Sequence, residues 1–441
     1  MGKIVEETML IMVNTGQNNN KFYHVTLNED NTVSKRWGRV GTEGTITTDR
    51  TGKTGYDRAI KAKEKKGYKV APIVSTGVSV KNNNTDHLEE VAQKYLAKDT
   101  NDTTISDLIK RLVTANQHQI MEQSGGLIKV TDDGTVKTAL GIVDLKTIAS
   151  ARQYLTKMRA TKTLAANRKN LEEYLTLIPQ SVGMKRGWDE EFIKTENLDK
   201  QTEFLDQLED AVKWGNKTKA AASDDDDDAD KFDITKHADL FRFKLDKIDN
   251  NSDEFKRINK LYEKTRNSMH SSNSLRLINV FAVEDVKGKE DYEKVKTDIG
   301  NVKELFHGTK ASNLLSILTK GLFVPNAGSG VQIQGRMFGD GVYFSDQSTK
   351  SLNYATGYWN GTRTNQNVFM LLNDVVMGNE YRPSRWDYSS SLHKAHKGAD
   401  SNGKVYNSIS IKGGTCNVRN NEMIIWDTKQ ICIKYICEFG A

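Results

Sequence analysis

The sequence predicts a multidomain α+β protein with a small β-rich N-terminal segment, an all-α middle region and an α+β C-terminal region. Two observations lead to this prediction. The chain has 441 residues, which is too many for one ordinary hydrophobic core. Its apolar pattern alternates at the start, follows a helical period in the middle and alternates again in the last third. We therefore expect three domains, at residues 1–82, 83–270 and 271–441.

The first segment is predicted to be a small sheet with one helix. MLIMV, KFYHVTL and TVSKRWGRVG alternate apolar and polar residues around Asn-rich turns. A helix is expected at 55–66, where apolar residues recur among Lys and Arg. The polar stretch 76–85 is the expected linker to the next domain.

Helical periodicity dominates the middle region. Helices are expected at 105–120, 145–158, 167–177, 198–214 and 254–267. Two segments interrupt this pattern. LIKVTDDGTVKT at 127–138 alternates around Asp133-Gly134, which is typical of a short hairpin. Five consecutive aspartates at 224–228 repel one another and predict a disordered, solvated loop between helices.

Strand patterns return in the last third. LRLINVFAV, VKELFHG, GVYFSD, NVFMLLNDVVMG and NEMIIWD are rich in β-branched and aromatic residues. A short helix is expected at 312–319, directly after VKELFHG. Sheet should therefore dominate this domain.

The net charge of +6 is unevenly distributed. Residues 1–82 hold 14 Lys and Arg against 8 Asp and Glu, so the whole positive excess lies there. A local basic excess is typical of polyanion binding, although a solvated lysine face has the same composition.

Membrane, secretory and metal-dependent classes are not supported. No apolar run approaches the ~20 residues that span a bilayer, and the N-terminus lacks the order of a secretory signal. Cys416, Cys432 and Cys437 have no metal-ligand spacing, so we expect a reduced compartment and no metal site.

Several common catalytic motifs are absent. DRTGKT contains Gly-Lys-Thr, but Thr47 stands where a phosphate loop needs glycine. No G-x-G-x-x-G follows a strand, no H-E-x-x-H is present and no serine lies in a G-x-S-x-G turn. Rossmann-type dinucleotide binding, zinc peptidase and serine hydrolase chemistry are therefore unsupported.

Three short segments concentrate the candidate chemistry, and a fourth lies between the last two. LFHGT, GVYFSD, KSLNYA and NEMIIWD contribute the candidates His307, Tyr343, Lys350, Ser351, Tyr354 and Glu422. Such a set can bind a flat aromatic amide and a polar sugar at the same time. Taken singly, a histidine in an apolar run is more often a satisfied core residue, and the two tyrosines fit core positions better than binding positions.

The last third resembles the poly(ADP-ribose) polymerase family. LFHGTKASNLLSILTKGL, GRMFGDGVYFSDQSTKSLNYA and NNEMIIWDTKQICIKY are similar to its three catalytic blocks, in order. YLTLIPQSVGMK and ALGIVDLKTI look like its regulatory helical domain, and RWGRVGTEG carries the signature that names the WGR domain. The resemblance covers nearly the whole chain. Without zinc-finger cysteines or a BRCT-like segment, the chain resembles the shorter, WGR-led members.

This resemblance implies catalytic roles. His307, Tyr343 and Glu422 fall on the family's triad, and Lys350 would lie beside the acceptor side of the site. Cleavage of the bond between nicotinamide and ribose builds positive charge on the ribose. Glu422 would stabilise that charge, take a proton from the acceptor, contact the ribose hydroxyl and direct chain elongation.

The resemblance also implies how NAD is held. His307 would hydrogen-bond the adenosine ribose, and the backbone of Gly308 would approach the carboxamide. Tyr343 and Tyr354 would stack on the nicotinamide ring, while Ser351 would hold the carboxamide oxygen.

In the first segment, the family implies nucleic-acid-binding roles for Trp37 and Arg39. Trp37 would pack against a nucleotide at a DNA break, and Arg39 would hold the interface to the helical domain. A buried structural tryptophan is the alternative. Asp340 stands where the family often carries a basic residue.

The expected function is that of a DNA-break-activated poly(ADP-ribose) polymerase. It would transfer ADP-ribose from NAD, a consumed substrate, to protein acceptors including itself, and then elongate the polymer without a metal. The helical region would cover the NAD cleft until DNA binds. The alternatives are a mono-ADP-ribosyltransferase, NAD hydrolysis without an acceptor and a catalytically silent DNA-binding scaffold. We expect a nuclear location in a eukaryote and a cytoplasmic one in a bacterium or phage.

Overall fold

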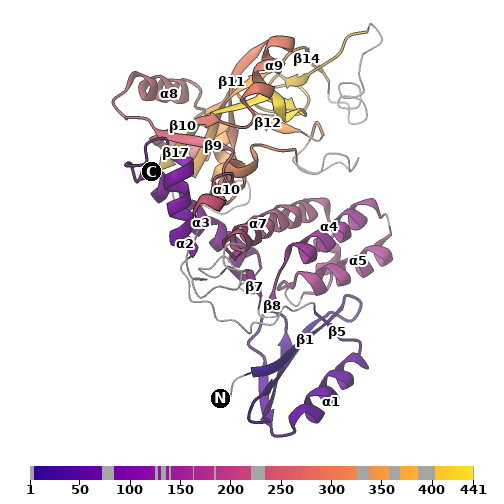
Figure 1. Ribbon diagram of the computed structural model, residues 1–441. Helices are drawn as coiled ribbons and strands as arrows, with labels where there is room; N and C mark the ends of the chain where they lie inside the picture. The colour runs from indigo at the N-terminus through magenta and orange to yellow at the C-terminus, as the bar shows by residue number, and fades with distance from the viewer. Residues whose placement is uncertain are drawn as a thin grey trace. The chain divides into compact units, whose positions relative to one another are not determined.

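The computed structural model folds the chain into two compact units (Figure 1). It describes residues 4–71, 84–124, 128–130, 136–138, 141–161, 163–182, 185–219, 234–324, 337–339, 341–356, 368–385 and 403–440. The first unit comprises Met1–Asp86 with Asn116–Phe232, and the second His87–Ala115 with Asp233–Ala441. The predicted loop at 224–228 and Asp340 lie outside the described residues. The three predicted domain ranges stay a prediction.

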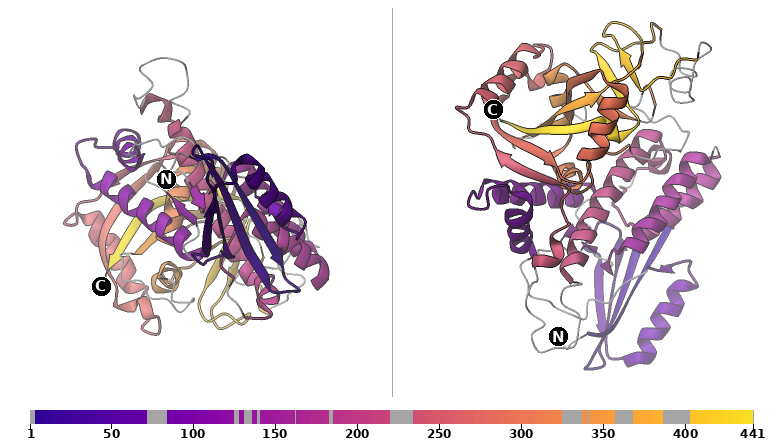
Figure 2. Two further views of the ribbon diagram at one scale, coloured as in Figure 1. Left: turned by 90° about the horizontal axis from the view of Figure 1, so that it is seen from below. Right: turned by 45° about the horizontal axis from the view of Figure 1, so that its top comes forward.

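An antiparallel five-stranded sheet of order β4-β3-β2-β1-β5 opens the first unit. Its strands are β1 (Ile4–Asn14), β2 (Asn19–Asn28), β3 (Val33–Arg39), β4 (Thr45–Asp49) and β5 (Lys69–Val70). Helix α1 (Gly52–Glu64) buries Tyr56 and Ala59 in a cluster with Leu10 and Val25, and it runs alongside the strands in both views of Figure 2. The predicted β-rich segment with one helix is confirmed.

The helical part of the first unit surrounds one apolar cluster that includes Leu171, Tyr174, Phe204 and Leu208. Its helices are α4 (Leu145–Ala160), α5 (Leu164–Leu177), α6 (Trp188–Phe192) and α7 (Thr195–Lys219). The predicted hairpin is also present, because β6 (Ile128–Val130) and β7 (Val136–Thr138) pair antiparallel. A third short strand, β8 (Gly141–Ile142), extends it.

Helix α2 (Asn84–Val91), the π-helical turn η1 (Ala92–Leu96) and helix α3 (Thr104–Gln123) follow the sheet. The residues of α3 up to Ala115 belong to the second unit. In that unit Arg111 forms an ion pair with Glu438, whose side chain is fully buried. The other carboxylate oxygen of Glu438 accepts from Asn279 Nδ2 at 2.8 Å.

Two sheets form the second unit. The antiparallel one has the order β11-β13-β17-β10-β9, and the other has the order β12-β16-β15-β14 with β14 and β15 parallel. The strands are β9 (Phe243–Lys247), β10 (Arg276–Asp285), β11 (Val302–Gly308), β12 (Val342–Phe344), β13 (Val368–Val376), β14 (Glu380–Tyr381), β15 (Ser408–Ile411), β16 (Glu422–Ile425) and β17 (Ile431–Gly440). The predicted α+β class is confirmed.

Helices flank these sheets. They are α8 (Asp253–Lys264), α9 (Lys289–Ile299), α10 (Ala311–Lys320) and α11 (Ser348–Ala355), with single 3₁₀ turns η2 (Ile234–His237), η3 (Ser271–Ser274) and η5 (Thr428–Gln430). The main core joins Ile258 and Tyr262 of α8 to Leu352 of α11 and to Met370 of β13.

Strand β9 was not predicted, because its range falls where helices were expected. It pairs antiparallel with β10. Phe243 and Leu245 are buried, while Lys244 between them is half-buried. This period-two pattern was the available signal. Both β9 and α8 therefore belong to the second unit rather than to the helical region.

Candidate active site

His307 lies near the end of β11, beside the end of β12. Phe306 and Ser345 exchange two backbone hydrogen bonds, of 2.9 and 3.0 Å. His307 Nδ1 donates to the carbonyl oxygen of Tyr343 at 2.9 Å, since a carbonyl oxygen only accepts. Burial lowers the pKa of His307, which favours the neutral ring. Nε2 is then an acceptor, suited to a hydroxyl group of a sugar.

The ring of Tyr343 is held through its hydroxyl group. The phenol oxygen accepts from the backbone N–H of Phe338 at 3.0 Å and donates to the carbonyl of Gly339 at 2.9 Å. In the β12–β16 pairing, Tyr343 lies opposite Ile424, two residues after Glu422. The tyrosine side chain is therefore fixed at a defined position along the strand that begins with the glutamate.

Helix α11 is mostly polar and yet buried, including Ser348, Thr349, Lys350, Ser351 and Asn353. Several of its polar side chains bond to other segments of the unit. Ser348 Oγ donates to the carbonyl of Tyr262 at 3.0 Å, and Ser351 Oγ donates to that of Phe306 at 3.2 Å. Because each bond reaches a different element, the helix is fixed against both α8 and β11.

Gly308 is a point of close approach between β11 and α11. A Cβ atom placed on Gly308 would lie 1.6 Å from the carbonyl oxygen of Ser351. No side chain fits there. The predicted role of Gly308 toward a carboxamide stays a prediction, and the packing of α11 is a separate reason for glycine.

Lys350 and Glu422 form the central ion pair of the site. Lys350 Nζ lies 2.9 Å from Glu422 Oε1, and the two side chains are only 9% and 15% exposed. Lys350 Nζ also donates to the backbone oxygen of Asn421 at 3.1 Å. Burial lowers the pKa of Lys350, and the Glu422 carboxylate opposes that shift. The pair joins α11 to the start of β16.

Tyr354 lies within electrostatic reach of the same carboxylate. Half of its surface is exposed, yet desolvation of the phenol, together with the Glu422 charge, raises the pKa of Tyr354 to about 12. The hydroxyl therefore stays protonated at neutral pH, which leaves a neutral aromatic ring exposed next to Lys350 and Glu422.

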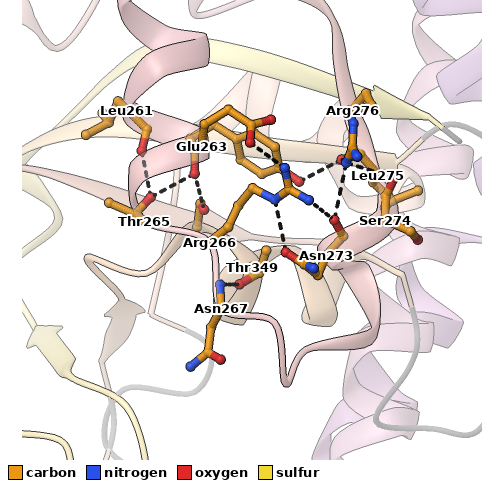
Figure 3. Close-up of polar contacts among 12 residues, drawn as sticks. Leu261, Glu263, Thr265, Arg266, Asn267, Asn273, Ser274, Leu275, Arg276 and Thr349 are labelled. Atoms are coloured by element: carbon orange, nitrogen blue, oxygen red, sulfur yellow. Dashed lines mark hydrogen bonds and ion pairs between the residues drawn. The ribbon is translucent and has the colours of Figure 1, made fainter.

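The segment between α8 and β10 also holds α11 (Figure 3). Arg266 Nε donates to Asn273 Oδ1 at 3.0 Å, which closes this segment on itself. The backbone N–H of Asn267 donates to Thr349 Oγ1 at 2.9 Å. His270, which the sequence did not suggest, contacts Thr349 Oγ1 through Nδ1 at 2.9 Å and accepts from Asn420 Nδ2 at 3.3 Å. It links α11 to the residues before Glu422.

The predicted site residues thus fall into two groups. Those of the last third lie on adjacent elements of the second unit, joined by the contacts of Lys350 with Glu422, of His307 with Tyr343, and of Gly308 with Ser351. Trp37 and Arg39 belong to the first unit. The polar neighbours Asp346, Thr349 and Asn421 were missed, although polar residues beside apolar strand runs were a usable signal.

Trp37 is half-buried on β3. Its ring lies 6.1 Å from that of Tyr23, in the cluster under α1. Arg39 donates to the backbone and side-chain oxygens of Asn18, at 2.8 and 3.2 Å. The Asn18 side chain also accepts from Trp188 Nε1 at 2.9 Å, so Arg39 lies where the sheet meets α6.

No group of three or more His, Cys, Asp or Glu side chains in the described ranges could hold a metal ion. No helix in them is both long and apolar enough to cross a membrane.

Comparison with protein families gives two matches. The family described as "Poly(ADP-ribose) polymerase catalytic domain" matches residues 252–440. The family described as "WGR domain" matches residues 6–73. The first range includes every candidate residue of the second unit, and the second includes Trp37 and Arg39.

Similar curated proteins point the same way. Poly [ADP-ribose] polymerase 2 of Homo sapiens is 27% identical over 408 residues, covering 86% of this chain and 66% of that protein. Poly [ADP-ribose] polymerase 1 of Gallus gallus is 24% identical over 486 residues, covering 99% of this chain and 45% of that protein. Protein mono-ADP-ribosyltransferase PARP4 of Mus musculus is 30% identical over 203 residues, covering 45% of this chain and 9% of that protein. The chain thus spans less than two thirds of each relative's length.

Proposed function

The chain is a WGR-led member of the poly(ADP-ribose) polymerase family, and from that premise we propose that it is an NAD-consuming ADP-ribosyltransferase activated by DNA breaks. Its product is a polymer of ADP-ribose built on protein acceptors, including the enzyme itself, with release of nicotinamide. In a eukaryotic source its location is nuclear, and in a bacterium or phage it is cytoplasmic.

The Lys350–Glu422 ion pair is the observation that carries this proposal. In the transfer, the bond between the nicotinamide nitrogen and ribose C1′ breaks, and nicotinamide leaves with the bonding electrons. A carboxylate beside C1′ stabilises the positive charge that develops on the ribose. Glu422, with its carboxylate oriented by Lys350 at 2.9 Å, suits this role. It also takes the proton of the acceptor hydroxyl as that oxygen attacks C1′.

The surrounding residues suit the rest of NAD. His307 Nε2 accepts from a hydroxyl of the adenosine ribose, since Nδ1 is committed to Tyr343. The rings of Tyr343 and Tyr354 stack on nicotinamide, at about 0.5–1.5 kcal/mol per aromatic pair. Gly308 and Ser351 present backbone and hydroxyl groups to the carboxamide. NAD is therefore a substrate here, held by its sugars and its nicotinamide.

Transfer and elongation are tested with labelled NAD on a denaturing gel, with and without nicked DNA. We expect a smear of modified protein that depends on DNA. Glu422→Gln keeps the size of the side chain but removes its charge, and should reduce the smear to a band or to nothing. Glu290→Gln, at an exposed position on α9, is the matched control and should leave the smear unchanged. A full smear in Glu422→Gln would refute the role of Glu422.

Single transfer is the second candidate. The similarity over 203 residues to a protein named a mono-ADP-ribosyltransferase favours it, because that stretch covers 45% of this chain. The same gel distinguishes the two candidates, since single transfer gives one shifted band in place of a smear.

Activation by DNA rests on the WGR domain. Trp37 is half-buried beside Tyr23, so part of its surface remains open to a nucleotide. Base stacking on an aromatic side chain is worth about 1–3 kcal/mol. Trp37→Ala should therefore weaken binding of nicked DNA by about 5- to 150-fold in fluorescence anisotropy at fixed salt. Unchanged affinity would leave Trp37 a packing residue.

The proposed regulation is that the helical region restrains the catalytic unit until DNA binds. A deletion of residues 86–269 would also remove β9 and α8, which belong to the sheet and core of the second unit. The informative variant keeps His87–Ala115 and Asp233–Ala441, joined by a flexible Gly/Ser linker. It should release more nicotinamide without DNA than the full chain. Equal or lower activity of the folded variant would contradict this regulation.

A further inference from the structure

Asn421, directly before Glu422, ties the start of β16 to three other segments. Its side-chain oxygen accepts from the backbone N–H of Gly413 at 2.8 Å. Its side-chain nitrogen donates to Asp346 Oδ2 at 2.7 Å. Its backbone oxygen accepts from Ser345 Oγ and from Lys350 Nζ, both at 3.1 Å. These four bonds restrain the peptide unit that carries the glutamate.

Asp346 is the acidic member of this cluster. It follows β12 and is half-buried, and its charge acts on Lys350 in the same direction as that of Glu422. Among the described residues, its buried Oδ1 atom has no hydrogen-bond partner. A buried carboxylate oxygen without a partner costs stability. The bond from Asn421 Nδ2 to the other oxygen, Oδ2, ties Asn421 to the residue that follows β12 by two positions.

We propose that Asp346 and Asn421 are positioning residues, which hold the Asn421 peptide so that Glu422 and Lys350 keep their relative geometry. This inference rests on the proposed function. Neither residue needs to touch NAD. Both act through the Asn421 carbonyl oxygen. This oxygen accepts a hydrogen bond from the Lys350 ammonium group, which also pairs with Glu422.

A small displacement at this point has a large effect on the reaction. Glu422 stabilises charge at one atom of the substrate, and a misplacement of about 1 Å costs on the order of 10²-fold in rate. NAD is held mainly by groups outside the start of β16, including His307 and Tyr354. Loss of the Asp346–Asn421 bond should therefore reduce kcat much more than it changes KM for NAD.

An exchange of the two side chains tests the bond. Asn421→Asp keeps the acceptor for the Gly413 N–H but places a second carboxylate next to that of Asp346, where the two repel each other. The kcat for nicotinamide release should then fall about 10- to 100-fold, while KM for NAD stays within about threefold of wild type. Adding Asp346→Asn restores a donor and an acceptor with the same net charge. We expect the double variant to recover kcat to within about fivefold of wild type. Glu290→Gln, at an exposed position on α9, is the activity control, and Asp346→Asn alone measures how much of any effect comes from the lost Asp346 charge, because its amide oxygen still accepts from Asn421.

A second measurement does not depend on catalysis. Lys350 is only 7% exposed in the wild-type protein, so reagents in solution reach it slowly. Asn421→Ala removes both side-chain hydrogen bonds of Asn421 without changing the net charge. An amine-acylating reagent, followed by peptide mass spectrometry, should then modify Lys350 several-fold faster than in wild type. Lys289, exposed on α9, is the internal reference and should react at the same rate in both proteins.

The outcomes separate this inference from the proposed function. A wild-type protein that releases no nicotinamide refutes the function, while the acylation rates still test the positioning. Unchanged Lys350 acylation in folded Asn421→Ala overturns the inference. The inference is also overturned if the double variant, Asn421→Asp with Asp346→Asn, unfolds at the wild-type temperature but has a kcat as low as that of Asn421→Asp. Recovery of kcat in the exchange, together with faster acylation in Asn421→Ala, supports it.

Discussion

Gly308→Ala is the substitution for which the structure gives the clearest magnitude. The added Cβ would lie 1.6 Å from the Ser351 carbonyl oxygen and 2.5 Å from its carbon. A normal contact between carbon and oxygen is about 3.3 Å, so β11 and α11 must separate by roughly 1.7 Å. Both atoms are backbone, so no side chain can rotate away. Helix α11, which carries Lys350, must move as a whole.

Two effects follow from this displacement. Overpacking of this kind costs about 1–3 kcal/mol of unfolding free energy. A shift of more than 1 Å between Lys350 and Glu422 should reduce the rate of nicotinamide release by about 10²-fold or more. Urea unfolding and a nicotinamide-release assay measure the two effects separately.

Gly16→Ala is the matched control. The nearest atom to its added Cβ is Asn14 Oδ1 at 3.6 Å, an ordinary contact. It should change stability by less than about 1 kcal/mol. Wild-type stability in Gly308→Ala would refute the packing argument, even if NAD binding were lost, because the clash is with α11 and exists without substrate.

Two further predictions concern buried ionisable groups. Arg111→Ala removes the guanidinium partner of the fully buried Glu438 carboxylate, and should cost about 1–3 kcal/mol of unfolding free energy in urea. The cost should be less than for a wholly buried pair, because Arg111 is 43% exposed. Glu438→Gln in that background should recover part of the loss, and no loss in the single variant would contradict the reasoning. Burial lowers the pKa of His307 from its usual 6.5. The neutral ring therefore contributes to the free energy of unfolding above pH 6.5, and this contribution is lost as pH falls through the folded-state pKa. His307→Gln should therefore lose less stability than wild type between about pH 7.5 and 5 in thermal unfolding, and equal losses would show that the shift is absent.

Local sequence patterns predicted the helices with clear apolar periods and most of the strands. The helix expected at 145–158 is α4 (Leu145–Ala160), and that expected at 312–319 is α10 (Ala311–Lys320). The hairpin around Asp133-Gly134 was also predicted, because turn residues flanked by alternating strands are a local signal.

Helix α11 shows why other elements were missed. STKSLNYA lacks an apolar stripe. Its two buried serines and its buried lysine bond to the backbone oxygens of Tyr262, Phe306 and Asn421, which are far away in the sequence. Only tertiary contacts make such a helix stable. The short strand β9 was missed for a related reason, since it is stabilised by pairing with β10.

The candidate site divides in the same way. Sequence blocks alone identified Lys350 and Glu422, but not that they form an ion pair, because that contact joins α11 to β16. Asp346 and Asn421 have no motif of their own. Their importance comes from hydrogen bonds between separate segments, which a single sequence does not reveal.

The central claim is that the site around Lys350 and Glu422 transfers ADP-ribose to protein and then extends the chain. The most direct test uses NAD labelled separately in the nicotinamide and in the adenylate phosphate, and counts both products in one reaction with nicked DNA. We predict that each nicotinamide released is matched by one ADP-ribose unit bound to protein, with many units per modified chain. Nicotinamide matched by free ADP-ribose, or no release at all, would contradict the claim.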